Sequence, residues 1–260
     1  NMRPCKAYEG NPLNYRDNID MVVFRENTEG LYSGFDFDTA NEFMCIEAFK
    51  NKIKDPSKTS ISCRVFTEEG CRRILKKGFE YAKQHKYPTN TIVHKANVVR
   101  ATDGMFLRIA NEVAKDFPEV EMWNQNIDAM CMQLIKNPEN FGVITTTNMF
   151  GDIVSDLTAQ LVGGLGFASS ASTSDTYGLF EPTHGSAPKY AGMYKVNPIA
   201  AILSAKLMFE WLGEKEIATK VEDAVKINIK EGKVRTYDMG GTSSTLEVAK
   251  DIIRILNKEG

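Results

Sequence analysis

The sequence predicts an α/β protein, because short apolar segments alternate with amphipathic stretches over most of its 260 residues. Residues 21–24 (MVVF), 91–93 (TIV) and 142–147 (GVITTT) are short, contain β-branched side chains and are followed by polar residues, as is typical of buried strands. No low-complexity tract, repeat or flexible linker separates them. In sheets of this class ligands bind at the carboxyl ends of the strands, so the polar residues there are the first candidates for a site.

Six helices are expected around these strands. Thr67 and the two glutamates after it open a helix that runs to about residue 85, with a shared apolar face formed by Cys71, Ile74, Leu75 and Phe79. A second helix is expected over about residues 102–117. The others are expected at residues 152–162, 198–212, 216–230 and 244–257. The last begins with a capping box, formed by Ser244 and Glu247.

Residues 34–63 interrupt this alternation. Their short, mixed pattern predicts a hairpin or an arm outside the main sheet. Neither G-x-G-x-x-G nor G-x-x-x-x-G-K-[ST] occurs, so no common phosphate-binding loop is available by motif. Function must therefore be inferred from charged residues at strand ends.

Composition excludes several classes of protein. The 32 basic and 34 acidic residues give a net charge of −2, which leaves no electrostatic footprint for duplex nucleic acid. Apolar runs are far shorter than the roughly 20 residues that span a bilayer. Five scattered cysteines, none in a C-x-x-C pair, support neither a disulfide framework nor a zinc site. We therefore expect a cytoplasmic protein with no membrane or nucleic-acid partner.

Two carboxylates follow the strand at residues 142–147. In NMFGDIVSD, Asp152 and Asp156 are four residues apart, and a helix that begins near Gly151 would place both on one face close to its N-terminus. Such a pair offers oxygen ligands to Mg²⁺ or Mn²⁺. The alternative for this motif alone is an acidic first turn on a solvated helix. A third acid, Asp128 in QNIDAM, favours the metal interpretation.

Arginine and tyrosine follow the strand at residues 21–24. In FRENTEGLY, Arg25 would sit at the strand end, where its guanidinium can hold a carboxylate through two hydrogen bonds. Tyr32 could serve as a proton donor. An ion pair of Arg25 with a neighbouring glutamate, beside a packing tyrosine, explains this segment equally well. Arg3, in NMRP, could supply a second clamp for an anion.

Two lysines complete the candidates. Lys95 closes the strand at residues 91–93, and a desolvated lysine there would have a lowered pKa suited to proton transfer, although a solvated surface charge is the simpler alternative. Lys189 and Tyr190 lie in a loop rich in glycine and proline at residues 180–198. A cation beside an aromatic ring suits a phosphate next to an adenosine, or a plain surface turn.

Taken together, these motifs resemble the β-decarboxylating dehydrogenases, the family of isocitrate, homoisocitrate, 3-isopropylmalate and tartrate dehydrogenases. The segments that carry the resemblance occur in the order of the family and span Arg3 to Pro198: NMRP, FRENTEGLY, HKANVVRATDG, NIDAM, NMFGDIVSD and THGSAPKYAG-x-x-KVNP. A weaker match follows in TYDMGG and the final helix. The resemblance implies a two-domain α/β fold with a doubly wound sheet that lacks the G-x-G-x-x-G motif.

The resemblance also implies the chemistry. Such enzymes oxidise a 2-hydroxy acid with NAD or NADP and then release the β-carboxylate as CO₂. By motif, Arg3 and Arg25 would clamp substrate carboxylates, while Tyr32 and Lys95 would bind substrate and transfer protons. The cation, Mg²⁺ or Mn²⁺, would be held by Asp128, Asp152 and Asp156. Asp128 and Lys95 would come from the second subunit of a homodimer with shared active sites.

The finer features favour isocitrate and NADP. FRENTEG is similar to the isocitrate, homoisocitrate and tartrate branches, whereas isopropylmalate enzymes typically show R-E-L-T-G-G. Lys189 and Tyr190 resemble the pair that meets the 2′-phosphate of NADP, to which Tyr237 could add a phenol; NAD is the alternative, because Gly241 replaces an arginine typical of NADP-type isocitrate enzymes. The resemblance places the remaining cofactor residues near adenine and nicotinamide: Glu181, His184, Gly185 and Asn197.

The resemblance suggests two domains. Residues 1–162 would form a small domain with a dimerisation arm at about 34–63, and residues 163–260 would form the C-terminal half of a large cofactor-binding domain. By resemblance, roughly the first hundred residues of the family pattern are missing, and with them the segment that contacts the distinguishing group of the substrate. A competing hypothesis is a non-catalytic regulatory subunit of a heteromeric isocitrate dehydrogenase; retention of Tyr32, Lys95 and the three aspartates argues against it.

Overall fold

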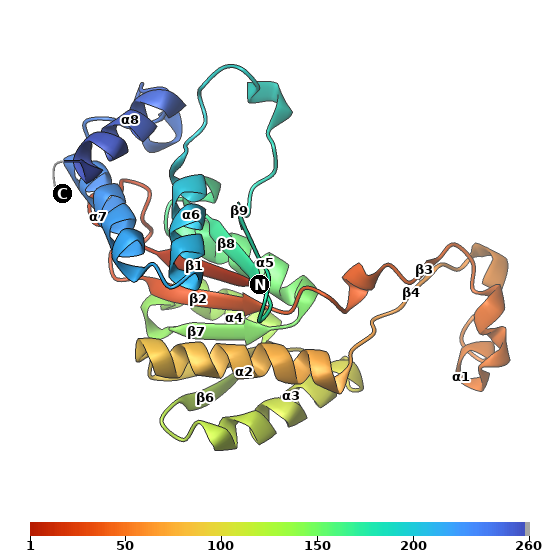
Figure 1. The fold of residues 1–260 in the computed structure, drawn as a ribbon. Helices are drawn as coiled ribbons and strands as arrows, with labels where there is room; N and C mark the ends of the chain where they lie inside the picture. The colour runs from red at the N-terminus through yellow and green to blue at the C-terminus, as the bar shows by residue number, and fades with distance from the viewer. Residues whose placement is uncertain (258–260) are drawn as a thin grey trace.

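The computed structural model describes residues 1–257 and contains one large mixed sheet (Figure 1). Its strand order is β6-β5-β7-β2-β1-β8-β9. The strands, in chain order, are β1 Met2–Lys6, β2 Asp20–Arg25, β5 Thr89–His94, β6 Glu121–Asn126, β7 Val143–Thr146, β8 Ser169–Thr173 and β9 Gly178–Pro182. Strands β6, β5, β7 and β2 are parallel, whereas β1, β8 and β9 each pair antiparallel with their neighbours.

The antiparallel direction of β1 decides where the site forms. Strand β1 begins where β2 ends, because Met2 pairs with Phe24 and Arg3 with Val23. The start of β1 therefore lies at the same sheet edge as the carboxyl ends of the four parallel strands. Successive residues of β1 face opposite sides, which sends Arg3 and Cys5 towards one helix layer and Pro4 towards the other.

Helices cover both faces of the sheet. The main ones are α2 Glu68–His85, α3 Thr102–Val113, α4 Ile127–Lys136, α5 Asn148–Leu161, α6 Ile199–Trp211, α7 Lys215–Glu231 and α8 Thr245–Leu256. Val22 and Phe24 of β2 pack with α2 and α3, whereas Met21 and Val23 pack with α4 and α5. A third apolar cluster joins α6, α7 and α8. Residues 21–24 of β2 are all apolar because successive side chains face opposite sides of the sheet and both sides are buried.

The arm lies apart from these layers. Strands β3 Asp36–Phe37 and β4 Ile61–Ser62 pair antiparallel in a two-stranded sheet of their own, and the short helix α1 Glu47–Lys50 lies between them in the chain. Figure 1 shows this segment, in orange, extending away from the main sheet. The expectation of a hairpin or arm outside the sheet is confirmed.

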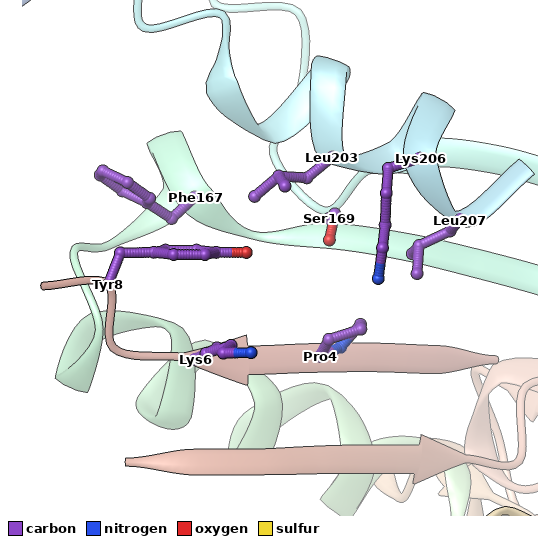
Figure 2. A pocket seen from close by; sticks show the side chains of 8 residues that line it. All are labelled: Pro4, Lys6, Tyr8, Phe167, Ser169, Leu203, Lys206 and Leu207. Carbon is purple, nitrogen blue, oxygen red and sulfur yellow. The ribbon is translucent and has the colours of Figure 1, made fainter. Parts of the chain in front are cut away.

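A group of charged side chains lies beside α6, at the end of β1 opposite to Arg3. A pocket lies here between Pro4 and Lys6 of β1 and Lys206 of α6 (Figure 2). Its volume is about 30 Å³, room for one or two water molecules. Glu222 of α7 lies 3.2 Å from Lys206, 3.3 Å from Lys6 and 3.5 Å from Lys226. Burial raises the pKa of Glu222, but these ammonium groups outweigh it and lower the pKa to about 2. The cluster is an ion pair network with little open space.

Most element predictions are confirmed. Helix α2 begins after Thr67, whose hydroxyl accepts a hydrogen bond from the Gly70 amide, and α8 carries the expected capping box. One boundary was wrong: α5 begins at Asn148, four residues before the predicted start, because Thr147 is the extended cap residue. Asp152 and Asp156 therefore lie beyond the first turn, where the helix dipole contributes little.

Two further expectations concern membrane-spanning helices and the division into domains. None of the helices within residues 1–257 combines the length and the apolar character that crossing a membrane requires. The division into domains at residue 162 stays a prediction: β8 and β9 continue the same sheet, while the third apolar cluster draws mainly on residues beyond 162.

Candidate functional site

Five of the predicted site residues lie at one edge of the sheet. Arg25 ends β2, Lys95 follows β5, Asp128 follows β6 and Asp152 lies one turn into α5, which follows β7. Antiparallel β1 adds Arg3 to the same edge. The topology therefore places these predicted residues where the parallel strands end, and their function stays a prediction.

Arg3 and Arg25 converge on the carboxylates of α5. Nη1 of Arg25 donates to Oδ1 of Asp152, and Nη1 of Arg3 lies 3.6 Å from that oxygen and 3.8 Å from Oδ1 of Asp156. The arginine side chains are only 9% and 13% exposed, whereas the two carboxylates are 38% and 63% exposed. Burial and the charge of Arg25 lower the pKa of Arg3. Arg25 is buried and Arg3 is largely covered, and guanidinium groups held close together in this way are suited to binding carboxylates.

Asn148 holds Arg25 in place, a role that the sequence did not suggest. Its Oδ1 accepts hydrogen bonds from Nε and Nη2 of Arg25 at 3.0 and 2.7 Å. Its Nδ2 donates to the carbonyl oxygen of Glu29 at 2.9 Å, and the residue is buried. Because Arg25 is bound by Asn148 and Asp152, its guanidinium has a fixed orientation. It does not pair with a neighbouring glutamate, the alternative that the sequence left open.

Tyr32 faces the same carboxylate. Its hydroxyl donates to Oδ2 of Asp152 at 2.7 Å, and the guanidinium of Arg25 lies 5.2 Å from the centre of its ring. The hydrogen bond to Asp152 raises the pKa of Tyr32, so its phenol stays protonated at neutral pH. A protonated phenol more than half exposed at this edge can donate a proton to a bound molecule.

A pocket of about 320 Å³ joins the arginines to part of the predicted cofactor site. Arg3 and Arg25 line one side, and Glu181, His184 and Gly185 line it from β9 and the loop beyond. The Nδ1 atom of His184 lies 2.9 Å from the carbonyl oxygen of Gly185. The volume is at the small end of ligand sites and suits a small polycarboxylic acid.

Lys95 and Asp128 form a separate pair. The ammonium of Lys95 donates to the Asp128 carboxylate, and this hydrogen bond lowers the pKa of Asp128. The Lys95 side chain is 23% exposed and ion-paired, so it is not the unpaired lysine in apolar surroundings that the sequence suggested. Within residues 1–257 no three acidic, cysteine or histidine side chains gather as a metal site. Participation of Asp128 from a second subunit stays a prediction.

The donor set at α5 fits part of a magnesium or manganese site. Asp152 and Asp156 are one turn apart on the same helix and leave carboxylate oxygens exposed beside the arginines. Oxygen atoms of carboxylates are the ligands that these cations prefer, and both cations retain several waters. The residues present therefore fit part of such a site, and a third carboxylate from elsewhere would strengthen it.

The adenosine-side candidates form an aromatic and cationic cluster. The rings of Tyr190 and Tyr237 lie 6.2 Å apart between their centres, and Lys189 lies 4.9 Å from the ring of Tyr190. Lys195, which the sequence did not single out, lies 4.6 Å from the Tyr237 ring and 5.7 Å from the Tyr190 ring. The hydroxyl of Tyr237 and the charge of Lys189 lower the pKa of Tyr190. Two ammonium groups and two phenols here can bind an anion such as phosphate.

Two other positions explain departures from the expected cofactor pattern. Gly241 packs against the chain at Arg235 so closely that a Cβ would lie 2.1 Å from the Arg235 carbonyl oxygen, so this loop has no room for an arginine there. Asn197 is buried and engaged: its Nδ2 donates to Asp238 at 3.0 Å and its Oδ1 accepts from the amide of Ile199 at 3.0 Å. Here it fixes the start of α6, and its role towards a cofactor stays a prediction.

Fold and site together describe an α/β protein with two arginines and a carboxylate pair at the carboxyl ends of parallel strands. A family model for isocitrate/isopropylmalate dehydrogenases matches residues 1–252, and the chain belongs to this family. Members of this family are NAD(P)-dependent β-decarboxylating dehydrogenases, oxidoreductases that act on a CH–OH group, and the family generally uses a divalent metal. The family resemblance and the enzyme class expected from the sequence are thereby confirmed.

Individual relatives differ in substrate. The chain is 45% identical to a 3-isopropylmalate dehydrogenase of Archaeoglobus fulgidus, over 99% of this chain and 73% of that one. It is 43% identical to a homoisocitrate dehydrogenase of Methanocaldococcus jannaschii, over 93% of this chain and 64% of that one. The crystal structure of an isocitrate dehydrogenase from Methylococcus capsulatus matches with a TM-score of 0.88 at 36% identity, over 98% of this chain and 72% of that one. The family is therefore clear, and the substrate is a separate question.

Proposed function

We propose that this protein catalyses the metal-dependent oxidative decarboxylation of isocitrate to 2-oxoglutarate with NADP. The observation that supports it most is the convergence of Arg3 and Arg25 on Asp152, beside a pocket of about 320 Å³. Two buried guanidiniums supply the charge that a polycarboxylate requires. An acidic first turn on a solvated helix would not be packed against two buried arginines.

In this proposal each side chain has a separate task. Arg3 and Arg25 bind and orient carboxylates of the substrate, and Asn148 keeps the guanidinium of Arg25 aligned. Asp152 and Asp156, with Asp128 of a second copy, hold Mg²⁺ or Mn²⁺. The bound cation would supply Lewis acidity that lowers the pKa of the substrate hydroxyl. Tyr32 would give its phenolic proton to the carbon that loses CO₂.

The preference for NADP rests on the cluster of Lys189, Tyr190, Lys195 and Tyr237. Two ammonium groups and two hydroxyls suit the dianionic 2′-phosphate, which NAD lacks. The absence of an arginine at Gly241 leaves this task to the lysines.

A second candidate function is oxidation of 3-isopropylmalate or homoisocitrate with NAD. The names of relatives that are 43–45% identical to this chain favour it. The sequence FRENTEG favours isocitrate or homoisocitrate, and Asn27 of that motif lines the pocket beside Arg25. A tartrate substrate remains part of the comparison because the same motif occurs in that branch.

One assay separates these candidates. The full-length protein is supplied with Mn²⁺ and each of isocitrate, homoisocitrate, 3-isopropylmalate and tartrate, with NADP or NAD, and reduced nucleotide is followed at 340 nm. The proposal predicts the highest kcat/KM for isocitrate with NADP. Activity only with 3-isopropylmalate and NAD would overturn the finer proposal. No turnover of any acid by a folded protein, alone or as a dimer, would favour the non-catalytic regulatory subunit instead.

A further inference from the structure

Asp103 is a fully buried carboxylate that the proposed chemistry does not use. It lies in the first turn of α3, but this helix has no side-chain cap, so the Asp103 carboxylate does not serve to cap the helix. Oδ2 accepts a hydrogen bond from the backbone amide of Lys95 at 2.7 Å, and Oδ1 accepts from Nη2 of Arg64 at 3.0 Å. A carboxylate without exposure is costly unless it is paired, so both contacts are needed.

Arg64 joins this carboxylate to the rest of the site. It follows β4 at the base of the arm, and its guanidinium lies 5.0 Å from the ring centre of Phe66 and 5.3 Å from that of Phe150. Phe150 belongs to α5, the helix that carries Asp152. The next residue, Val65, accepts a backbone hydrogen bond from Gly30 at 2.9 Å, two residues before Tyr32. Arg64 thus contacts Asp103 of α3 and Phe150 of α5, while its neighbour Val65 ties the same segment to the backbone near Tyr32.

The backbone around Lys95 is held from both sides. The carbonyl oxygen of Lys95 accepts hydrogen bonds from the amides of Val98 and Val99, both at 2.9 Å. The amide of Ala96 donates to Nδ1 of His94 at 3.1 Å. Because the amide of Lys95 itself is bound by Asp103, the long side chain leaves the backbone from a fixed point, and in this structure its ammonium is paired with Asp128.

We propose that Arg64 and Asp103 form a positioning pair for Lys95. The proposal rests on the proposed function and on the role that the family resemblance implies for Lys95, proton transfer in the active site of a second copy. Neither residue of the pair touches substrate; Asp103 fixes the Lys95 backbone, and Arg64 neutralises and orients Asp103. Loss of the pair lets the Lys95 ammonium leave its productive position, which lowers kcat more than it raises KM.

The first experiment compares variants of the full-length protein. Asp103→Asn and Arg64→Met are each expected to lower kcat by about 10–100-fold while KM for the acid changes less than about threefold. Arg64→Lys keeps the charge and should recover part of kcat. The double variant should be no slower than the slower single one, because both act through the same contact. Asp251→Asn, which removes a carboxylate of α8 that is bound by Arg254 of the same helix and by Asn228 of α7, is the matched control and should keep wild-type kcat.

The second experiment uses mixed dimers. Asp103→Asn damages the lysine that a subunit donates, and Asp152→Asn damages the subunit's own carboxylate site, so a mixed dimer retains one intact site. Random mixing of the two impaired proteins should give about a quarter of wild-type activity, well above that of either protein alone. Lys95→Ala mixed with Asp152→Asn is the positive control. A purely structural defect of Asp103→Asn would not be complemented.

The outcomes separate the two proposals. An unchanged kcat in folded Asp103→Asn and Arg64→Met, judged by circular dichroism and thermal unfolding, would overturn the positioning role. Complementation by Lys95→Ala but not by Asp103→Asn would overturn it as well. If neither mixture regains activity, the shared active site fails, and the kcat and KM values of the single variants decide the positioning role. Should Asp103→Asn not fold, Arg64→Met and Arg64→Lys provide the same comparison.

Discussion

Strand β1 carries a charge cluster at each end, and the two clusters differ in what surrounds them. Arg3, at its start, lies with Arg25 and Asp152 beside a pocket of about 320 Å³. Lys6, at its end, lies with Lys206 and Glu222 beside a pocket of only about 30 Å³. In the first cluster the cations are buried and the anions exposed; in the second a buried glutamate is enclosed by lysines. Charged residues alone therefore do not distinguish the two ends of β1, whereas the size of the pocket that their cations line does.

The comparison is tested most strongly at Asp152. Asp152→Asn should lower kcat/KM for the acid by about 1,000-fold, because several kcal/mol of metal-dependent transition-state stabilisation are lost. Titration calorimetry with Mn²⁺ should show weaker binding, while thermal unfolding stays close to wild type. Asp175→Asn, at the exposed turn between β8 and β9, is the control. Retained turnover with unchanged Mn²⁺ affinity would refute the metal assignment.

The next largest effect is expected in the cluster of Lys189, Tyr190, Lys195 and Tyr237. Replacing Lys189 by Asp and Tyr190 by Ile removes a cation and a phenol and adds a negative charge, so the ratio of kcat/KM for NADP to that for NAD should fall about 100-fold. The ratio is measured with the preferred acid at fixed ionic strength. The exposed Lys220→Asp serves as the surface control. An unchanged ratio would mean that these side chains do not meet the 2′-phosphate.

A smaller effect is expected from substitution of Asn148, which tests how Arg25 is held in the first cluster. Asn148→Ala removes two hydrogen bonds to Arg25, so the guanidinium loses orientation and KM for the acid should rise about tenfold. kcat should change less. Asn111→Ala, which removes an exposed amide from α3, is the comparison variant. Equal KM values for the two variants would show that Arg25 is held without Asn148.

The second cluster should respond in stability and leave activity unchanged. The pKa of Glu222 falls from 4.5 to about 2 on folding, so its ionised form stabilises the native state fully above pH 4.5, and this contribution is lost as pH falls towards 2. Glu222→Gln should lower the free energy of unfolding by roughly 2–3 kcal/mol at pH 7, and by less below pH 4.5. Urea unfolding from pH 7 to pH 3 measures this. A pH-independent difference, or a large loss of kcat, would contradict it.

Sequence patterns predicted the parts of the fold in which local signals agree with packing. The Thr67 cap, the apolar face of α2 and the capping box of α8 are local features, and the structure contains all three. Strands β1, β6, β8 and β9 were not predicted. Strand β6 is exposed or half-buried throughout, and β8 is mostly serine, so neither has the apolar pattern on which strand prediction depends.

The candidate site divides in the same way. Motifs placed Arg25, Tyr32 and Asp152 at strand ends, and the structure brings them together. Asn148 and Lys195 were missed, because their roles depend on which distant residues they meet. The helix containing Asp152 begins earlier than predicted. Gly151 and Asp152 suggested a start near residue 152, whereas Thr147 is the cap residue and the helix begins at Asn148. Tertiary contacts of this kind leave no periodic or spacing signal in a single sequence.

The pairing of β1 with β2 has one further consequence. Side chains alternate along a strand, so sliding β1 by a single residue would turn Arg3 away from α5 and bring a neighbour in its place. Such a slip would leave the backbone ladder largely paired and the enzyme without one of its two proposed substrate-binding arginines. Substitutions in β1 far from any ligand can thus abolish catalysis in a protein that still appears folded.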